Sequence, residues 1–268
     1  MYEQTKSLDL ISSTISAGSI FDRNSMEALM RCIDTLSPLT NGRTDRVVQL
    51  ATAIGNQVRL ENPDLEELKV AVLFCDIGMW AISDDIIHKK GRLTLDEFKM
   101  VQQHPEYSLN ALDEISLGEK TKKAILCQHE KYDGSGYPNR LMGNDIPFLA
   151  QIVNVACTLY GITAERSYRD AIPVEKAIEI IRNETKQQFH PDIVRAVMEL
   201  HSKGVIEKIL IKPVKDPFKR KMHEAKDTTQ YIKEKKHLSD FDHSDKSHIK
   251  VEERLNSLRE IIEDSSIE

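Results

Sequence analysis

The sequence predicts an all-α fold, and three observations support that prediction. Apolar residues recur at intervals of three and four, as they do across residues 41–60. Helix-start signals are present; Thr94 followed by Glu97 has the spacing of a capping box. No long stretch alternates apolar and polar residues, as a strand with one buried face would. We therefore expect helices joined by loops and no sheet.

Composition limits the class of protein. The chain has 268 residues, 40% hydrophobic and 30% charged, which indicates a folded core with a solvated appendage. A net charge of −6 argues against general nucleic-acid binding, and no apolar run is long enough for a membrane span. The first residues lack a secretory signal. The four cysteines have no CxxC spacing, so we interpret them as reduced thiols of a cytoplasmic protein: Cys32, Cys75, Cys127 and Cys157.

The first half of the chain predicts four helices, and the fourth ends in an informative acid. They cover about residues 4–17, 25–36, 41–60 and 63–77. Arg43 lies on the apolar face of the third. Asp76 lies in the last turn of the strongly apolar fourth, where burial and the helix dipole both disfavour a carboxylate. We expect Asp76 to have a cationic or metal partner; the alternative is an exposed carboxylate at a fraying end.

The second half predicts further helices around a glycine-containing loop. A loop over 79–93, with a short turn at 83–87, precedes a helix from Thr94 to about Leu112 that points His104 inward. A lone inward histidine is usually a hydrogen-bonded core residue. The remaining predicted helices cover about 118–130, 147–166, 173–183 and 190–200.

The C-terminal part changes in composition. Residues 213–248 are rich in charged and polar side chains and predict a solvated helix or a disordered tail. Residues 249–262 regain an apolar stripe that needs a surface to bury it, formed by Val251, Leu255, Leu258 and Ile262. We therefore divide the chain into N-terminal helices (1–37), a core domain (38–212) and a charged tail (213–268).

The central motif is Cys-Gln-His-Glu-Lys-Tyr-Asp-Gly-Ser-Gly-Tyr-Pro, residues 127–138. It predicts a helix end that carries Gln128, His129 and Glu130, followed by a glycine loop that Pro138 terminates. Gly134 and Gly136 have the spacing of a phosphate cradle, but this signal is weak, and we favour a plain glycine turn with no ligand.

Residues 129–138 resemble the signature loop of HD-GYP domains, which are bacterial, all-helical, metal-dependent phosphodiesterases of cyclic di-GMP. The resemblance extends over about residues 40–200 and includes further segments: Asp76-Ile77-Gly78, Gly91 to Glu97, His104-Pro105, Ile152 to Ala156, Arg166 to Arg169 and Phe189 to Pro191. It implies an HD-superfamily helical bundle of the HD-GYP type with a charged C-terminal extension.

The metal-ligand positions that this resemblance implies are only partly retained. Asp76, His104 and His129 match ligands, whereas four other ligand positions carry Arg43, Cys75, Gln128 and Cys157, and a lysine position carries Met79. Three scattered ligands cannot hold two metals at ordinary affinity, and Arg43 repels a divalent ion. We therefore expect no catalytic residue and no cofactor, or at most a single divalent metal.

The two substituted cysteines leave an alternative open. One zinc could be held by Cys75, Asp76, His104 and Cys157. We favour the interpretation that both thiols are small apolar fillers, because Arg43 would lie beside the metal.

The resemblance and its departures predict a catalytically degenerate signalling protein, acting as a scaffold, as a metal-independent cyclic di-GMP sensor, or as both. Arg43, Arg166 and Arg169 are candidate phosphate-binding residues. A partner such as a diguanylate cyclase (GGDEF) domain would contact the loop at Asp133, Gly134, Gly136, Tyr137 and Pro138. The alternatives are an active phosphodiesterase with a reduced metal centre and a structural component of a larger bacterial assembly, docked through the tail. Whether the protein is a homodimer is left open.

Overall fold

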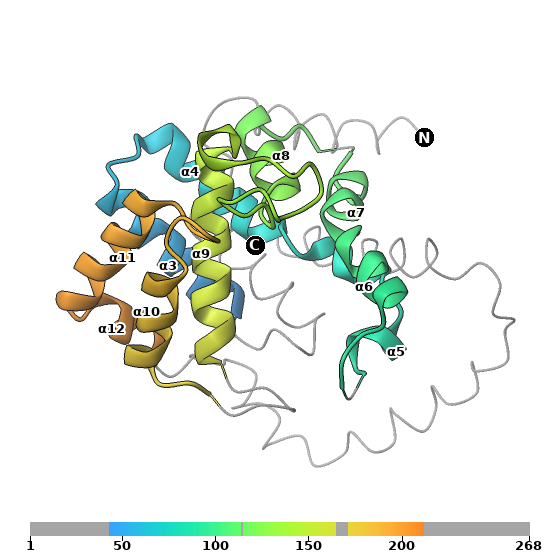
Figure 1. Ribbon diagram of the computed structural model, residues 1–268. Helices are drawn as coiled ribbons and strands as arrows, with labels where there is room; N and C mark the ends of the chain where they lie inside the picture. The colour runs from blue at the N-terminus through green and yellow to red at the C-terminus, as the bar shows by residue number, and fades with distance from the viewer. Residues whose placement is uncertain (1–42, 90, 114, 165–170, 212–268) are drawn as a thin grey trace, which may run out of the picture.

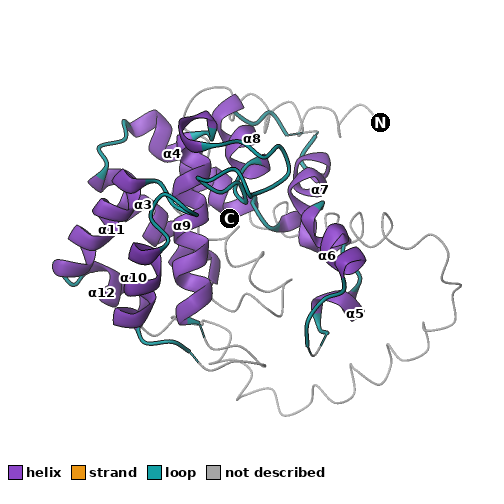
Figure 2. Ribbon diagram, in the orientation of Figure 1, coloured by secondary structure: helices purple, strands orange, loops and turns teal. Residues whose placement is uncertain are grey.

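The computed structural model describes residues 43–211 except 90, 114 and 165–170. Within this range every regular element is a helix, which confirms the all-α prediction (Figure 2). None of the described helices is both long enough and apolar enough to cross a membrane. The helices predicted at 4–17 and 25–36, and the apolar stripe at 249–262, lie outside the described residues.

Helix α9 (Phe148–Thr163) is the centre of the bundle (Figure 1). Its sequence is almost entirely apolar, and a helix that is apolar all round must be buried on all sides. It packs against α3 (Arg43–Gln57), α8 (Glu119–Leu126) and α10 (Val174–Asn183). This central position lets residues of α9 reach both the glycine loop and the face of α3 that carries Arg43.

The other long helices complete the core around α3 and α8. Helix α4 (Asn62–Phe74) packs between those two, and α11 (Pro191–Ser202) and α12 (Val205–Ile211) pack on α3. The sequence did not identify α12 as a separate helix. The fully buried side chains include Leu50, Ile54, Leu68, Ile125, Ile152, Leu159 and Ile193.

The prediction of one continuous helix from Thr94 to Leu112 is wrong. The structure divides it at Gln103 into α6 (Leu95–Gln102) and α7 (His104–Ala111). Pro105 lacks the N–H that would bond the carbonyl of Val101, so the helix cannot continue through it. The capping box at the start of α6 is confirmed, with Glu97 N–H donating to Thr94 Oγ1 at 3.2 Å.

The predicted end of α8 is also wrong, because the helix stops at Leu126 and not near residue 130. Cys127 caps it, and a turn follows in which Glu130 N–H donates to Cys127 O at 3.0 Å. Gln128 and His129 therefore leave from a turn rather than from a helix face.

Two short elements lie apart from the bundle. Helix α5 (Asp84–Ile87) and helix α6 bury none of their residues, and Figure 1 shows them extending away from α9. They follow η1 (Ile77–Ala81), the 3₁₀ turn that leads out of α4. A second 3₁₀ turn, η2 (Gly143–Asp145), precedes α9.

Gly78 allows α7 to approach the turn that follows Asp76. Its N–H donates to Ser108 Oγ at 2.9 Å, and a Cβ added there would lie 2.1 Å from His104 O and 2.4 Å from Ser108 N. Only a residue without a side chain fits against this backbone. The close contact brings the start of α7, and with it His104, against Asp76.

We expect Gly78→Ala to lower the free energy of unfolding by about 1–3 kcal/mol, because the new methyl group would push α7 away. The matched control is Gly161→Ala in α9, where a Cβ would meet nothing within 4 Å. That change should be neutral or stabilising by up to about 1 kcal/mol. Urea unfolding of both variants measures the difference, and equal stabilities would contradict the proposed packing role of Gly78.

Candidate functional site

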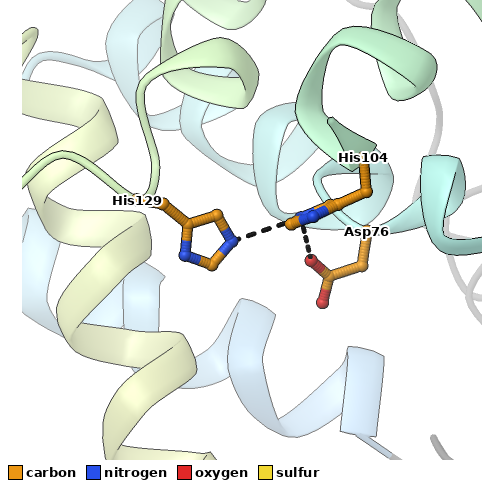
Figure 3. Close-up of side chains that lie close together, drawn as sticks. All are labelled: Asp76, His104 and His129. Atoms are coloured by element: carbon orange, nitrogen blue, oxygen red, sulfur yellow. Dashed lines mark hydrogen bonds and ion pairs between the residues drawn. The ribbon is translucent and has the colours of Figure 1, made fainter. Parts of the chain in front are cut away.

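Three side chains from separate segments meet beside α9. Asp76 follows α4, His104 begins α7, and His129 follows α8 (Figure 3). His104 lies between the other two, with its Nε2 3.4 Å from Asp76 Oδ1 and 3.2 Å from His129 Nε2. The prediction that His104 points inward is confirmed, since it is buried.

The ring of His104 is held in one orientation by the helix break that precedes it. Its Nδ1 lies 2.7 Å from Val101 O, the carbonyl that Pro105 cannot bond. A carbonyl only accepts, so Nδ1 carries a proton, and Nε2 faces Asp76 and His129. The same proline thus ends a helix and orients a site residue.

Asp76 has a cationic partner, as the sequence predicted. The Arg43 guanidinium pairs with Asp76 Oδ2, while Arg43 Nη2 donates to Cys157 Sγ at 3.7 Å. Burial would raise the pKa of Asp76, but the Arg43 charge and the His104 hydrogen bond hold that pKa well below its usual range. Burial also lowers the pKa of Arg43. The negative charge of Asp76 more than offsets this effect, so the pKa of Arg43 is raised.

The remaining substituted positions are engaged with their neighbours. Gln128 is buried, and its Nε2 donates to Cys75 O at 2.6 Å, the same carbonyl that accepts from Ser108 Oγ at 3.1 Å. The Cys75 thiol donates to Val72 O at 3.3 Å. Its contact with Cys157, together with burial, raises the pKa of Cys75. These side chains therefore occupy the pocket, and their polar atoms bond to neighbouring protein atoms.

The alternative zinc site at Cys75, Asp76, His104 and Cys157 is not assembled. Among the described residues, the donor atoms that gather within 4.8 Å of one another belong to Asp76, His104 and His129 and to neither cysteine. The thiol of Cys75 points back to its own helix, and Cys157 faces Arg43.

The three clustered residues fit a single metal ion in part. When two ligand atoms each lie about 2.1 Å from one ion, they lie roughly 3.0–3.4 Å from each other. The distances from His104 Nε2 to Asp76 Oδ1 and to His129 Nε2 both match this range. The expectation that no metal binds is therefore not confirmed. Arg43, however, already neutralises Asp76 and places a fixed positive charge beside the cluster. A second ion has no such set of donors among the described residues.

The glycine loop is built around Glu130, whose role the sequence did not reveal. Its carboxylate accepts from Asn139 N at 2.7 Å and Leu141 N at 3.1 Å, and its carbonyl accepts from Asn154 Nδ2 of α9 at 2.9 Å. A Cβ on Gly136 would lie 2.3 Å from Lys131 N. An acid near glycines was visible in the sequence, but its burial and its backbone partners were not.

Tyr137 joins this loop to the cluster. Its ring stacks on His129 with centroids 4.9 Å apart and planes 12° apart, and Phe98 of α6 meets its edge at 6.4 Å. Burial raises the pKa of Tyr137. Of the predicted partner-contact residues, Tyr137 lies half-buried over His129 and Gly136 is buried, whereas Asp133 is exposed. Arg166 and Arg169 lie outside the described residues.

Comparisons with known proteins agree on one family. The family model described as HD domain matches residues 27–193. The chain is 31% identical over 170 residues to 3'3'-cGAMP-specific phosphodiesterase 3 of Vibrio cholerae, covering 63% of this chain and 37% of that protein. It is 29% identical over 179 residues to the cyclic di-GMP phosphodiesterase response regulator RpfG of Xanthomonas campestris, covering 66% and 47%. The chain thus spans about a third to a half of these relatives.

A solved structure supports the fold. The crystal structure of a cyclic GMP-AMP specific phosphodiesterase from V. cholerae superposes with a TM-score of 0.56 and 16% identity. The match covers 88% of this chain and 59% of that one. At this identity the likeness concerns the arrangement of the helices alone.

We expect Arg43→Met to lower the free energy of unfolding by roughly 1–3 kcal/mol, because it leaves the partly buried Asp76 carboxylate without its cation. The matched control is Lys99→Met, which removes an exposed ion pair with Asp96 and should cost less than about 0.5 kcal/mol. Urea unfolding at neutral pH measures both. An Arg43→Met variant as stable as the parent would show that Asp76 does not depend on Arg43.

Stability of chelator-treated protein should fall as the pH drops from about 6.5 to about 4. Burial and the neighbouring His104 lower the pKa of His129 from 6.5 to about 4, so in this window the unfolded chain takes up a proton that the folded protein does not. This linkage is worth about 3 kcal/mol. The slope of unfolding free energy against pH should flatten in His129→Gln, and an unchanged slope would contradict the assignment.

Proposed function

This chain belongs to the HD domain family, as a member of its HD-GYP branch. We propose that it is a signalling domain that binds a cyclic dinucleotide or a protein partner and does not hydrolyse the cyclic dinucleotide. In this proposal the pocket that corresponds to a metal centre holds an internal ion pair. The protein then acts through its surface and its affinity for a cyclic dinucleotide, not through turnover.

The observation that carries this proposal is the pairing of Arg43 with Asp76. A carboxylate that a guanidinium already neutralises is a poor ligand for a divalent ion, and the guanidinium repels that ion directly. Hydrolysis by a metal-activated water needs an ion with an open coordination position. Cys75, Gln128 and Cys157 supply no further carboxylate or imidazole ligand at the positions where the family resemblance places them.

Retention of the loop supports a binding role. Glu130, Gly136 and Asn154 hold its backbone through contacts that involve none of the substituted positions. Its exposed residues, such as Asp133 and Arg140, are therefore presented in a fixed arrangement. A GGDEF domain is the partner that the family resemblance suggests for this surface.

A cyclic dinucleotide is the ligand class that the relatives suggest, since their names specify cyclic di-GMP or 3'3'-cGAMP phosphodiesterases. Arg43 is a weaker phosphate ligand than we first inferred, because Asp76 neutralises its charge. In this proposal phosphate recognition falls to Arg166 and Arg169.

A second candidate is a phosphodiesterase with one metal ion. It is favoured by the spacing of Asp76, His104 and His129, whose donor atoms lie within 4.8 Å of one another. In that case the three residues would hold the ion, which would supply Lewis-acid chemistry, and Arg43 would have to release Asp76. The two candidates differ in metal content and in turnover.

Metal analysis, hydrolysis and calorimetry on one preparation separate these candidates. Full-length protein is incubated without oxygen with Mn²⁺ or Fe²⁺, desalted and analysed for metal. The same sample is then incubated with cyclic di-GMP and, separately, 3'3'-cGAMP. We expect substoichiometric metal, no linear product, and cyclic dinucleotide binding that EDTA does not change.

The outcomes are distinct. One metal per chain with turnover that His104→Ala abolishes would overturn the proposal and establish the second candidate. Ligand binding that Arg166→Ala and Arg169→Ala weaken, with no turnover, supports the sensor. If no ligand binds, the scaffold predicts that a GGDEF domain is retained by the protein and released by Asp133→Lys with Arg140→Glu. Failure of both binding assays would reject a binding role of either kind.

A further inference from the structure

The short segment 187–190 supports the glycine loop and also leads into α11. Tyr132 N–H of the loop donates to Gln188 O at 3.1 Å. The next residue of the loop does the same, since Asp133 N–H donates to Gln187 O at 2.8 Å. The loop that carries the proposed recognition surface therefore rests on this segment, away from the pocket of Arg43.

His190 fixes this segment to the rest of the fold. It is the N-cap residue of α11, and its Nδ1 accepts a hydrogen bond from Asp192 N–H at 3.1 Å. Its ring also meets two aromatic rings, Tyr132 of the loop and Phe148 of α9. Both centroids lie 5.4 Å from the His190 centroid, with interplanar angles of 84° and 87°. One side chain thus joins the loop, α9 and α11.

We propose that His190 is a positioning residue for the glycine loop, and that it holds the loop in place only while its imidazole is neutral. The position of the loop would then depend on pH. The importance of this control for binding rests on the proposed function. The control itself rests on the hydrogen bond at Nδ1 and on the ring contacts, and it can be measured without any ligand.

The hydrogen bond at Nδ1 defines the protonation state that this arrangement requires. A backbone N–H only donates, so His190 Nδ1 must offer a lone pair and the single ring proton lies on Nε2. In an imidazolium both ring nitrogens carry protons, and Nδ1 would direct its proton at Asp192 N–H. The helix dipole also disfavours a positive charge at the N-terminus of α11. Protonation therefore removes the cap and releases the segment whose carbonyls hold the loop.

The surroundings of His190 favour the neutral ring. Burial lowers its pKa from the usual 6.5, Asp192 raises that pKa and Arg195 lowers it. The last two effects largely offset each other, because Arg195 Nη2 and Asp192 Oδ1 form an ion pair at 2.8 Å. Tyr132 from the loop and Phe148 from α9 face the ring with aromatic groups. The support of the loop is therefore complete above pH 6.5, and it is lost as the pH falls through the lowered pKa.

Amide hydrogen exchange of the full-length protein, followed by NMR without a ligand, tests the proposal. Protection factors of the Tyr132 and Asp133 amides are measured from about pH 7.5 to about pH 4.5, on both sides of an ordinary histidine pKa. We expect both to fall about fivefold as the His190 ring becomes protonated, the factor that corresponds to an N-cap worth about 1 kcal/mol. The Glu130 amide is the internal reference and should change much less, because it donates to Cys127 O.

Two variants separate this positioning role from a general loss of stability. His190→Asn keeps a side-chain oxygen that accepts from Asp192 N–H and does not titrate, so the protection of the two loop amides should no longer depend on pH. His190→Ala has no acceptor, so their protection should be low at every pH. A merely structural contact of the ring would leave the pH profile of His190→Asn like that of the parent.

The parent protein alone can overturn the proposal, even if a variant fails to fold. The ¹⁵N spectrum of the His190 ring reports its tautomer and its protonation in the same samples. Three results would contradict the proposal: a neutral ring with its proton on Nδ1, a ring that stays neutral throughout the titration, or a protonated ring with both loop amides still protected. Failure of the protein to bind a cyclic dinucleotide or a GGDEF domain would not affect the outcome, because no ligand enters this measurement.

Discussion

The arrangement of the pocket depends on one electrostatic constraint, a carboxylate held just past the C-terminus of α4. The last five residues of α4, Val70 to Phe74, are apolar and buried, so the chain carries Asp76 into a partly buried site where an isolated negative charge would be costly. Arg43 meets this requirement from α3, and His104 meets it from α7. Gly78 and Ser108 then hold α7 close enough for the contact. Three helices are thus positioned around a single charge.

A guanidinium and a metal ion can both neutralise such a charge, but they leave different pockets behind. An ion accepts several ligands and can keep one position open for water. Arg43 is covalently attached, donates its N–H groups to Asp76 and Cys157, and presents no position at which a water could be activated. Gln128 also fills the pocket without offering a metal ligand of the imidazole type, because its Nε2 donates to Cys75 O. The substitutions therefore act together.

The parts of the site that could be predicted from the sequence are those that follow from local pattern and charge. The apolar run before Asp76 indicated an acid that needs a cationic or metal partner, and helical spacing placed His104 inward. The break at Gln103 was missed because its consequence is visible only in three dimensions, where His104 bonds the carbonyl that Pro105 leaves free. The end of α8 was missed for a similar reason, since Gln128 turns toward a carbonyl far away in the sequence.

The loop and the pocket beneath it are held by separate sets of interactions. Glu130 bonds two amides of its own loop, and Asn154 anchors its carbonyl to α9. The pocket is held by Arg43, Asp76 and Gln128. The stacking of Tyr137 on His129, together with the hydrogen bond from Tyr137 N–H to His129 O at 3.2 Å, joins the two sets, and neither contact needs a metal. Replacing ligands in the pocket therefore leaves the loop's internal hydrogen bonds in place. A recognition surface can persist on such a loop after the chemistry beneath it has changed.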